Sequence, residues 1–334
     1  MNETLAVFLA GFGLLLLKMA VVLGVALGAA AYLVLFERKL LGRFQLRYGP
    51  NRVGPFGLLQ PMADGVKMLL KEDLIPEGAD RVLFLLAPAL PTVTALLTFA
   101  VVPFGDTLTV MGHAVPLVIS DLNVGLLFVL ALSSYSVYGV VLGGWASNSK
   151  YSLLGAIRGG AQMISYELSL GLSLVPVVML SRSLSLVDIV NAQASCPFIL
   201  MQPLAFAIFF ISALAESKRV PFDLPEAENE LMAGYHTEYS GMRFALYFVG
   251  EYLNMFALGL LLAVFFLGGW RGPFLPPFVW LLLKAAVVPF FLVWSRASLP
   301  RLRYDQLMHL GWKVLTPLAL VNIVLTGLGM VLWG

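Results

Sequence analysis

The chain has 334 residues, of which 60% are hydrophobic and only 12% are charged, and its net charge is +2. Soluble domains carry about 25% charged residues, so water cannot solvate a surface of this composition. The composition therefore excludes an ordinary soluble domain and indicates an integral membrane protein, with no sign of a nucleic-acid partner. The single cysteine, Cys196, excludes an intrachain disulfide and an iron–sulfur cluster held by this chain alone.

A membrane-spanning helix needs roughly 20 mostly apolar residues. The chain has eight such apolar runs, without an internal repeat or a second soluble domain. The sequence therefore predicts an all-α polytopic membrane protein with eight transmembrane helices in a single domain, 1–334. The runs are Leu5–Phe36, Val82–Phe104, Leu117–Leu142, Ala161–Leu180, Phe198–Ala215, Phe244–Leu267, Phe274–Trp294 and Trp312–Trp333. The first run is too long for an upright helix and should tilt or kink.

Basic residues decide the orientation of these spans. Most of the 21 Lys and Arg residues lie in the connections after the odd-numbered spans. The positive-inside rule places those connections on the cytoplasmic face, and eight spans then put both termini outside. The expected inner-face loops are 37–81, 145–160, 216–243 and 296–313.

The first inner loop contains two Gly-Pro steps followed by an amphipathic segment, Leu58–Leu70. Asp64, Lys67 and Lys71 share one helical face there. This length and pattern predict a short helix that lies in the membrane interface. The helix either anchors the protein to anionic lipid or forms the rim of a lipid-facing opening for an apolar substrate. Asp64 favours the second interpretation, because an acid adds nothing to anionic-lipid binding.

The third inner loop carries an unusual group of five acids: Glu216, Asp223, Glu226, Glu228 and Glu230. Pro225 predicts a helix start, which would place Asp223, Glu226 and Glu230 on one face. Acids in a first helical turn also suit the helix dipole, so an ordinary capping role is one interpretation. The other is a carboxylate cluster whose members raise one another's pKa into a range useful for proton exchange.

Four ionisable residues interrupt the apolar runs: Lys18, Glu167, Glu251 and Lys284. A charge near mid-bilayer costs from about 2.5 to more than 10 kcal/mol, so it normally faces a cavity, a partner or a proton path. Snorkelling or a structural ion pair would explain Lys18 equally well.

The sequence gives no sign of a bound cofactor. The histidines are expected in loops, and nucleotide, dinucleotide and metal-binding motifs are absent from the sequence. The histidines are His113, His236 and His309. We therefore expect this chain to bind no metal, flavin or NAD.

Several loop stretches have a distinctive sequence: Glu37–Pro55, Gln60–Lys67, Lys71–Asp73, Gly144–Arg158, Val220–Glu228, Gly234–Met242 and Arg296–Asp305. They resemble the loops of a known family, the quinone-site membrane subunit of respiratory complex I, also called the H subunit of the NADH-quinone oxidoreductases. The resemblance implies a multi-pass protein of a bacterial inner (plasma) membrane. It would form the membrane part of a quinone chamber and couple quinone reduction to proton translocation, while NADH and flavin bind elsewhere in the complex.

The resemblance also implies roles for particular residues and partners. The quinone, ubiquinone or menaquinone, is the substrate, and its expected contacts are Glu37, Arg38, Asp64 and Lys67. The expected proton-relay residues are Glu167, Glu216, Asp223, Glu226, Glu228, Glu230 and Glu251. Expected partners are membrane lipid and the other complex I subunits, both hydrophilic and antiporter-like. The alternative is the equivalent anchor of a membrane-bound hydrogenase or of a ferredoxin- or F420-linked complex.

Overall fold

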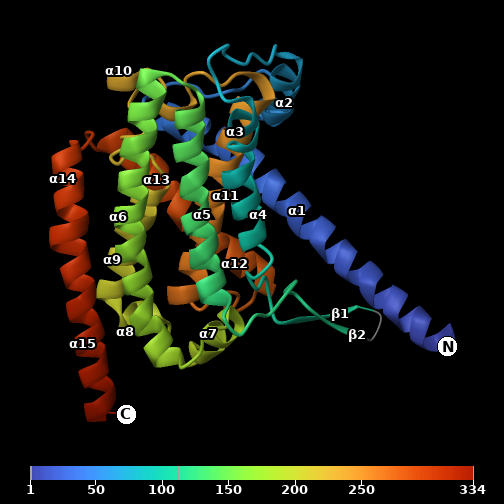
Figure 1. Cartoon of the computed structure of the whole chain (residues 1–334). Coiled ribbons are helices and arrows are strands. Elements are labelled where there is room, and N and C mark those ends of the chain that lie inside the picture. The colour runs from blue at the N-terminus through green and yellow to red at the C-terminus, as the bar shows by residue number, and fades with distance from the viewer. Residues whose placement is uncertain (1, 111–112, 334) are drawn as a thin grey trace.

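A computed structural model describes residues 2–110 and 113–333, without the side chains of residues 2–10, 108–114, 228–229 and 333. The described chain is a bundle of long helices with a small hairpin at one end (Figure 1). The helices are α1 (Asn2–Phe44), α2 (Gln60–Leu70), α3 (Arg81–Leu86), α4 (Ala89–Thr98), α5 (Gly125–Ala146), α6 (Lys150–Ser181), α7 (Leu186–Ala192), α8 (Phe198–Met201), α9 (Pro203–Glu216), α10 (Glu228–Leu231), α11 (Gly241–Phe266), α12 (Pro277–Ala285), α13 (Val287–Ser298), α14 (Tyr304–His309) and α15 (Thr316–Trp333). Short helical segments are η1 (Pro55–Gly57), η2 (Gly234–His236) and the π-helical η3 (Leu310–Leu315), and the strands are β1 (Thr107–Val110) and β2 (His113–Pro116).

Seven segments of the described chain are long and apolar enough to cross a membrane. They are Gly11–Phe44, Arg81–Thr98, Gly125–Ala146, Lys150–Ser181, Gly241–Phe266, Pro277–Ser298 and Tyr304–Leu332. The expectation of a mostly helical membrane protein is thus confirmed. The remaining expected span, Phe198–Ala215, is divided at Gln202 into α8 and α9, and α9 has only 14 residues. The count of eight spans therefore stays a prediction.

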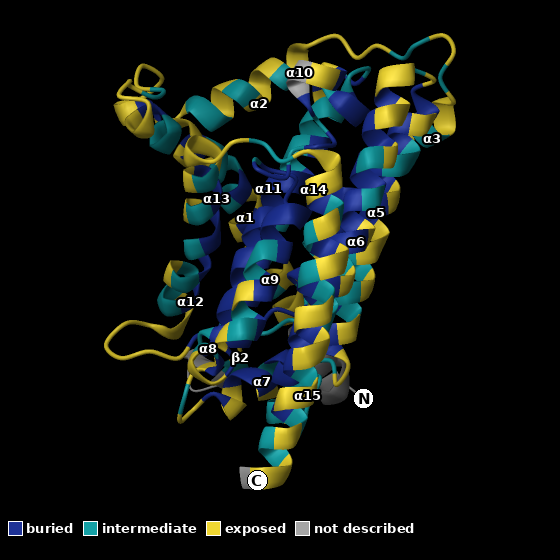
Figure 2. Cartoon of the chain, turned by 90° about the vertical axis from the view of Figure 1, so that its left-hand side faces the viewer, coloured by how far each residue is buried: buried dark blue, intermediate teal, exposed yellow. Residues whose placement is uncertain are grey.

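Helix α11 forms the centre of the bundle and α1 its most inclined member. Every residue from Gly250 to Phe266 except Asn254 is buried, and Figure 2 shows α11 dark blue among more exposed helices. Helix α1 runs unbroken for 43 residues and leans away from the bundle toward its N-terminal end (Figure 1). The expected tilt of the first span is seen in this inclination.

Proline breaks one of the spans, and glycine allows close packing at the break. Pro289 has no N–H to donate to the carbonyl of Ala285, so the helical hydrogen bonding is interrupted between α12 and α13. A Cβ on Gly259 of α11 would lie 2.4 Å from that carbonyl oxygen, which only glycine avoids. Gly259 therefore lets α11 approach the interrupted helix closely.

The structure corrects several sequence expectations. Most of the expected loop 145–160 is helical, because α6 begins at Lys150. The connection after α4 contains an antiparallel hairpin in which Thr107 pairs with Pro116, so the described chain is not purely α-helical. His309 ends α14, His236 ends η2 and His113 lies in β2, so the three histidines are not in loops. The hairpin was missed because its apolar, β-branched residues adjoin apolar runs that were assigned to the spans.

Candidate functional site

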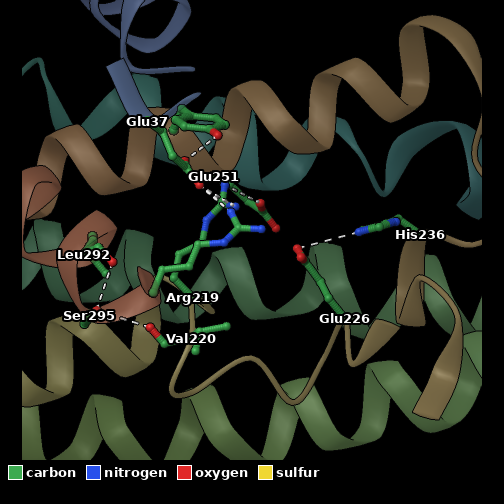
Figure 3. A network of polar contacts seen from close by, with 10 residues as sticks. Glu37, Arg219, Val220, Glu226, His236, Glu251, Leu292 and Ser295 are labelled. Carbon is green, nitrogen blue, oxygen red and sulfur yellow. Dashed lines mark hydrogen bonds and ion pairs between the residues drawn. The ribbon is translucent and has the colours of Figure 1, made fainter. Parts of the chain in front are cut away.

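After α9 the backbone directs two basic side chains, Lys218 and Arg219, into the interior of the protein. Lys218 adopts a left-handed backbone conformation with φ of 55°, and Lys218 and Arg219 are each only 6% exposed. The Arg219 guanidinium lies between Glu37 of α1 and Glu251 of α11 (Figure 3). Its Nη1 is 3.7 Å from Glu37 Oε1, and its Nη2 is 3.6 Å from Glu251 Oε2. One buried cation is thus shared by acids from two helices.

Each of these acids also accepts a hydrogen bond from a tyrosine. Tyr252 Oη donates to Glu37 Oε2 at 2.7 Å, and Tyr235 Oη donates to Glu251 Oε1 at 2.6 Å. Arg296 of α13 donates a further hydrogen bond to Glu37. Arg219 also lies 4.9 Å from the centre of the Tyr252 ring, within range of a cation–π interaction.

The contacts of Arg219 with the two acids are ion pairs rather than hydrogen bonds, because both are longer than 3.5 Å. Among the described residues, Arg219 Nε and Nη2 and Glu251 Oε2 have no hydrogen-bond partner. At an effective dielectric constant of about 20, either ion pair is worth about 4 kcal/mol of Coulomb energy. A shift of less than about 1 Å would let the guanidinium form a full hydrogen bond to one acid at the expense of the other.

A third acid, Glu226, lies beside this cluster of charges. Glu226 Oε1 is 3.6 Å from His236 Nε2 (Figure 3). Burial opposes ionisation of Glu226, but the His236 ring and the charge of Arg219 outweigh it and hold its pKa at about 2. Burial also raises the pKa of Tyr235 well above its ordinary value, aided by the nearby carboxylates. Glu226 therefore stays anionic at neutral pH, while Tyr235 stays a proton donor.

A narrow cavity of about 50 Å³ runs along α11 from this cluster into the membrane region. Its polar lining includes Glu251, Lys218, Asn254, Ser133 and Glu216. A water molecule needs roughly 10–15 Å³ of such volume, so the cavity has room for about three or four. Burial lowers the pKa of Lys218, which lines this cavity, against the opposing charge of Glu251. The cavity provides a polar route between Glu251 and Glu216.

Two consecutive serines of α5, the first of which lines the cavity, each donate a hydrogen bond to one acid. Ser133 Oγ donates to Glu216 Oε1 at 2.7 Å, and Ser134 Oγ donates to Glu167 of α6. Glu167 is half-buried on the outer side of the bundle. The acids Glu251, Glu216 and Glu167 therefore follow one another from the bundle centre to its lateral surface.

The expected helix from Pro225 is wrong, because α10 covers only Glu228–Leu231. Side chains donate hydrogen bonds to the backbone carbonyls just before Pro225 instead. Gln162 donates to the carbonyl of Phe222, and Arg301 donates to the carbonyl of Asp223. Asp223, Glu226 and Glu230 consequently share no helical face.

The three acids of this loop have separate environments. Asp223 pairs with Arg301 at 3.0 Å, but burial and the charge of Glu226 raise its pKa to about 6. Glu230 pairs with Arg158 at 2.6 Å at the surface. The Glu228 side chain lies outside the described residues. The structure thus brings Glu226 to the Arg219 cluster and leaves Asp223 and Glu230 at its edge.

The expected quinone contacts are divided between two places. Arg38 and Asp64 form an ion pair at 2.8 Å that ties α1 to α2, and Lys67 is exposed on α2. Glu37 points away from them into the buried Arg219 cluster. Helix α2 exposes its apolar residues Met62, Val66 and Leu69, as an interfacial helix would.

Sequence reasoning missed several residues of the site. These are Ser133, Ser134, Arg219, Tyr235, Tyr252 and Arg296. A Lys-Arg pair directly after an apolar run and before an acidic loop was the one signal available for Arg219. The tyrosines and serines carried no signal, because only the fold brings them to the acids.

These features define a polytopic membrane protein with a buried series of acids that starts at a shared arginine. The family model described as NADH dehydrogenase matches residues 17–327. One of the NADH-quinone oxidoreductase H subunits of Syntrophobacter fumaroxidans is 68% identical over 324 residues, covering 97% of this chain and 98% of that relative. An H subunit of Geobacter metallireducens is 67% identical, with 93% and 95% covered, and the H subunit of Syntrophotalea carbinolica is 61% identical, with 98% of each covered. The chain belongs to the family formed by the H subunits of NADH-quinone oxidoreductases.

Proposed function

We propose that this chain is the membrane subunit of NADH-quinone oxidoreductase (complex I) that forms the membrane part of the quinone chamber and couples quinone reduction to proton translocation. The observation that carries the proposal is the single guanidinium of Arg219 shared between Glu37 and Glu251. The relatives named above are NADH-quinone oxidoreductase subunits, which supports this assignment over a hydrogenase or ferredoxin- or F420-linked anchor. The other subunits of the complex are its partners.

The quinone side of the site lies where α1 meets α2. The quinone, as substrate, passes the exposed apolar face of α2 and the Arg38–Asp64 pair, with Lys67 on the same helix. Glu37 precedes Arg38 directly in α1 and faces the protein interior. Glu37 therefore connects events at the opening with the buried Arg219.

Reduction of a quinone to a quinol consumes two electrons and two protons, so negative charge develops on the quinone oxygens before protonation. That charge, on the Glu37 side, attracts Arg219 and weakens its contact with Glu251. Glu251, left without its cation in a buried site, takes up a proton. The proton can then pass through the cavity to Glu216 and on to Glu167, which is half-buried at the lateral surface of the bundle.

We propose that α8 and α9 together complete an eighth crossing, so that both termini lie outside a bacterial inner membrane. Helix α1 begins and α15 ends at the same end of the bundle (Figure 1), which supports an even number of crossings. The arginine-rich segments around α2 and α14 lie at the opposite end, as the positive-inside rule requires of the cytoplasmic face.

Replacement of Asp64 tests the quinone assignment. Asp64→Asn removes a partly exposed ion pair worth about 1 kcal/mol, so the quinone concentration for half-maximal turnover should rise about fivefold. NADH oxidation by a hydrophilic artificial acceptor, which takes electrons before the membrane, should stay unchanged. Asp305→Asn is the matched control, because it removes the exposed Arg303–Asp305 pair away from α2. An equal loss of both activities in Asp64→Asn, or a quinone effect as large in Asp305→Asn, would contradict the assignment.

A further inference from the structure

Lys18 is a charged residue of the spans that the proposed function does not use. It lies well inside α1, is half-buried, and makes no hydrogen bond or ion pair with the residues whose side chains the structure describes. An ammonium group in a membrane span costs about 2.5 kcal/mol or more unless it finds water, a cavity or an anion. Lys284, the other lysine of the spans, donates instead to three backbone carbonyls of the α11–α12 connection.

Lys18 lines a groove of about 560 Å³ between α1, α12 and the segment around the hairpin. Apart from Lys18, its lining is entirely apolar: Leu17, Val21, Val22, Val25, Phe104, Val115, Pro116, Leu117, Val118, Ile119, Phe278 and Leu282. The groove exists because α1 leans away from the bundle at this end, which is opposite the arginine-rich loops (Figure 1). An occupant must therefore combine hydrocarbon with one negative charge.

The groove follows α1 from Leu17 to Val25, for about 12 Å at about 1.5 Å per residue. Helices that pack closely in a membrane use small residues such as Gly, Ala and Ser at their contact, and the lining of this groove has none. A flexible hydrocarbon chain can fill such a groove without them.

The depth of Lys18 suits a lipid headgroup. Phe278 and Leu282, which line the groove with Lys18, belong to the first two turns of α12, within about 8 Å of the start of that helix. The stem of a lysine side chain can stay in the apolar region while its ammonium group extends toward the interface, where the phosphates of the adjoining leaflet lie.

We propose that this groove binds one acyl chain of an anionic phospholipid whose phosphate pairs with Lys18. The pairing accounts for a cation that has no partner among the described side chains, and the chain covers the apolar walls. The site is separate from the quinone chamber and does not depend on the proposed function.

Photoactivatable phospholipids test the site on the assembled complex in proteoliposomes. A phosphatidylglycerol probe with a diazirine in its acyl chain should label peptides that contain residues 17–25, 115–119 or 278–282. A phosphatidylcholine probe of the same chain length should label them at least threefold less. Lys18→Met should reduce the phosphatidylglycerol label at least threefold, and Lys18→Arg should retain it. Lys150→Met, which removes an exposed lysine at the other end of the bundle, should leave the label unchanged.

A second variant keeps the charge but fills the groove. Val21→Trp should reduce the label as strongly as Lys18→Met does, which protects the test if one variant fails to assemble. Equal labelling by the two lipids, or an unchanged label in Lys18→Met and Val21→Trp, would overturn the proposal. The absence of any lipid label on these peptides in the wild-type complex would also overturn it, because a protein partner would then cover the groove.

Discussion

The shared position of Arg219 makes a specific prediction for the substitution Arg219→Lys. Lysine keeps the positive charge but has one ammonium group in place of two guanidinium nitrogens. Arg219 Nη1 lies 3.7 Å from Glu37 Oε1, and Arg219 Nη2 lies 3.6 Å from Glu251 Oε2. A single ammonium can stay with only one of these acids, so the variant loses the connection between them.

The size of the effect follows from the loss of one buried ion pair. Each contact carries about 4 kcal/mol of Coulomb energy at an effective dielectric constant of about 20. Part of this is recovered, because the tyrosine hydrogen bonds to both acids remain. A net loss of about 1.5 to 3 kcal/mol in the coupling step corresponds to a roughly 10- to 150-fold lower quinone reductase rate.

The assay compares quinone reduction with NADH oxidation by a hydrophilic acceptor in the purified complex. Arg219→Lys should lower the first and spare the second. Arg303→Lys provides the matched control, since Arg303 and its partner Asp305 are 77% and 69% exposed and such pairs contribute little. Wild-type quinone reduction in Arg219→Lys, or an equal loss in Arg303→Lys, would refute the shared-arginine mechanism.

Two further predictions concern pH and topology. The fold raises the pKa of Asp223 from 3.8 to about 6. Protonated Asp223 therefore contributes about 3 kcal/mol to the free energy of unfolding below about pH 4, and this contribution is lost as the pH rises through 6. The thermal midpoint of the wild-type complex relative to Asp223→Asn should therefore fall between pH 4.5 and 6.5, and a constant difference across that range would contradict the assignment. In a Cys196→Ser background, single cysteines introduced near Asn2 and near Trp333 should react with a membrane-impermeant reagent added from outside. Reaction only after permeabilisation of the membrane would show that the proposed topology is wrong.

Local patterns were sufficient to predict much of the fold. Apolar runs of spanning length located the long helices, and the periodicity of Leu58–Leu70 predicted α2, observed at Gln60–Leu70. These features depend on neighbouring residues, which a single sequence displays directly. The prediction of a helix from Pro225 was wrong, because Gln162 and Arg301, which are distant in the sequence, donate hydrogen bonds to the backbone carbonyls of that loop.

The acids of the candidate site could be found from the sequence, but their organisation could not. Glu251 and Glu167 were conspicuous because charges are rare in apolar runs. The cation between Glu37 and Glu251 is Arg219, which lies in a loop. This loop is far from Glu37 in the sequence, and two further helical segments separate it from the helix that carries Glu251. No local pattern encodes that convergence, and none indicates that Glu37 turns inward while Arg38 pairs with Asp64.

The substitution Glu251→Gln tests the central claim most directly, because it keeps the size of the side chain and its capacity for hydrogen bonds while removing its charge and its titration. The assembled complex in proteoliposomes is followed for NADH-driven quinone reduction and internal pH together, beside Glu77→Gln, which changes an exposed acid of the inner-face loop. The account predicts normal assembly of Glu251→Gln with at least a tenfold loss of quinone reduction and of the proton gradient, and an intermediate loss in Glu228→Gln. Wild-type turnover and gradient in Glu251→Gln would contradict a proton relay through this residue.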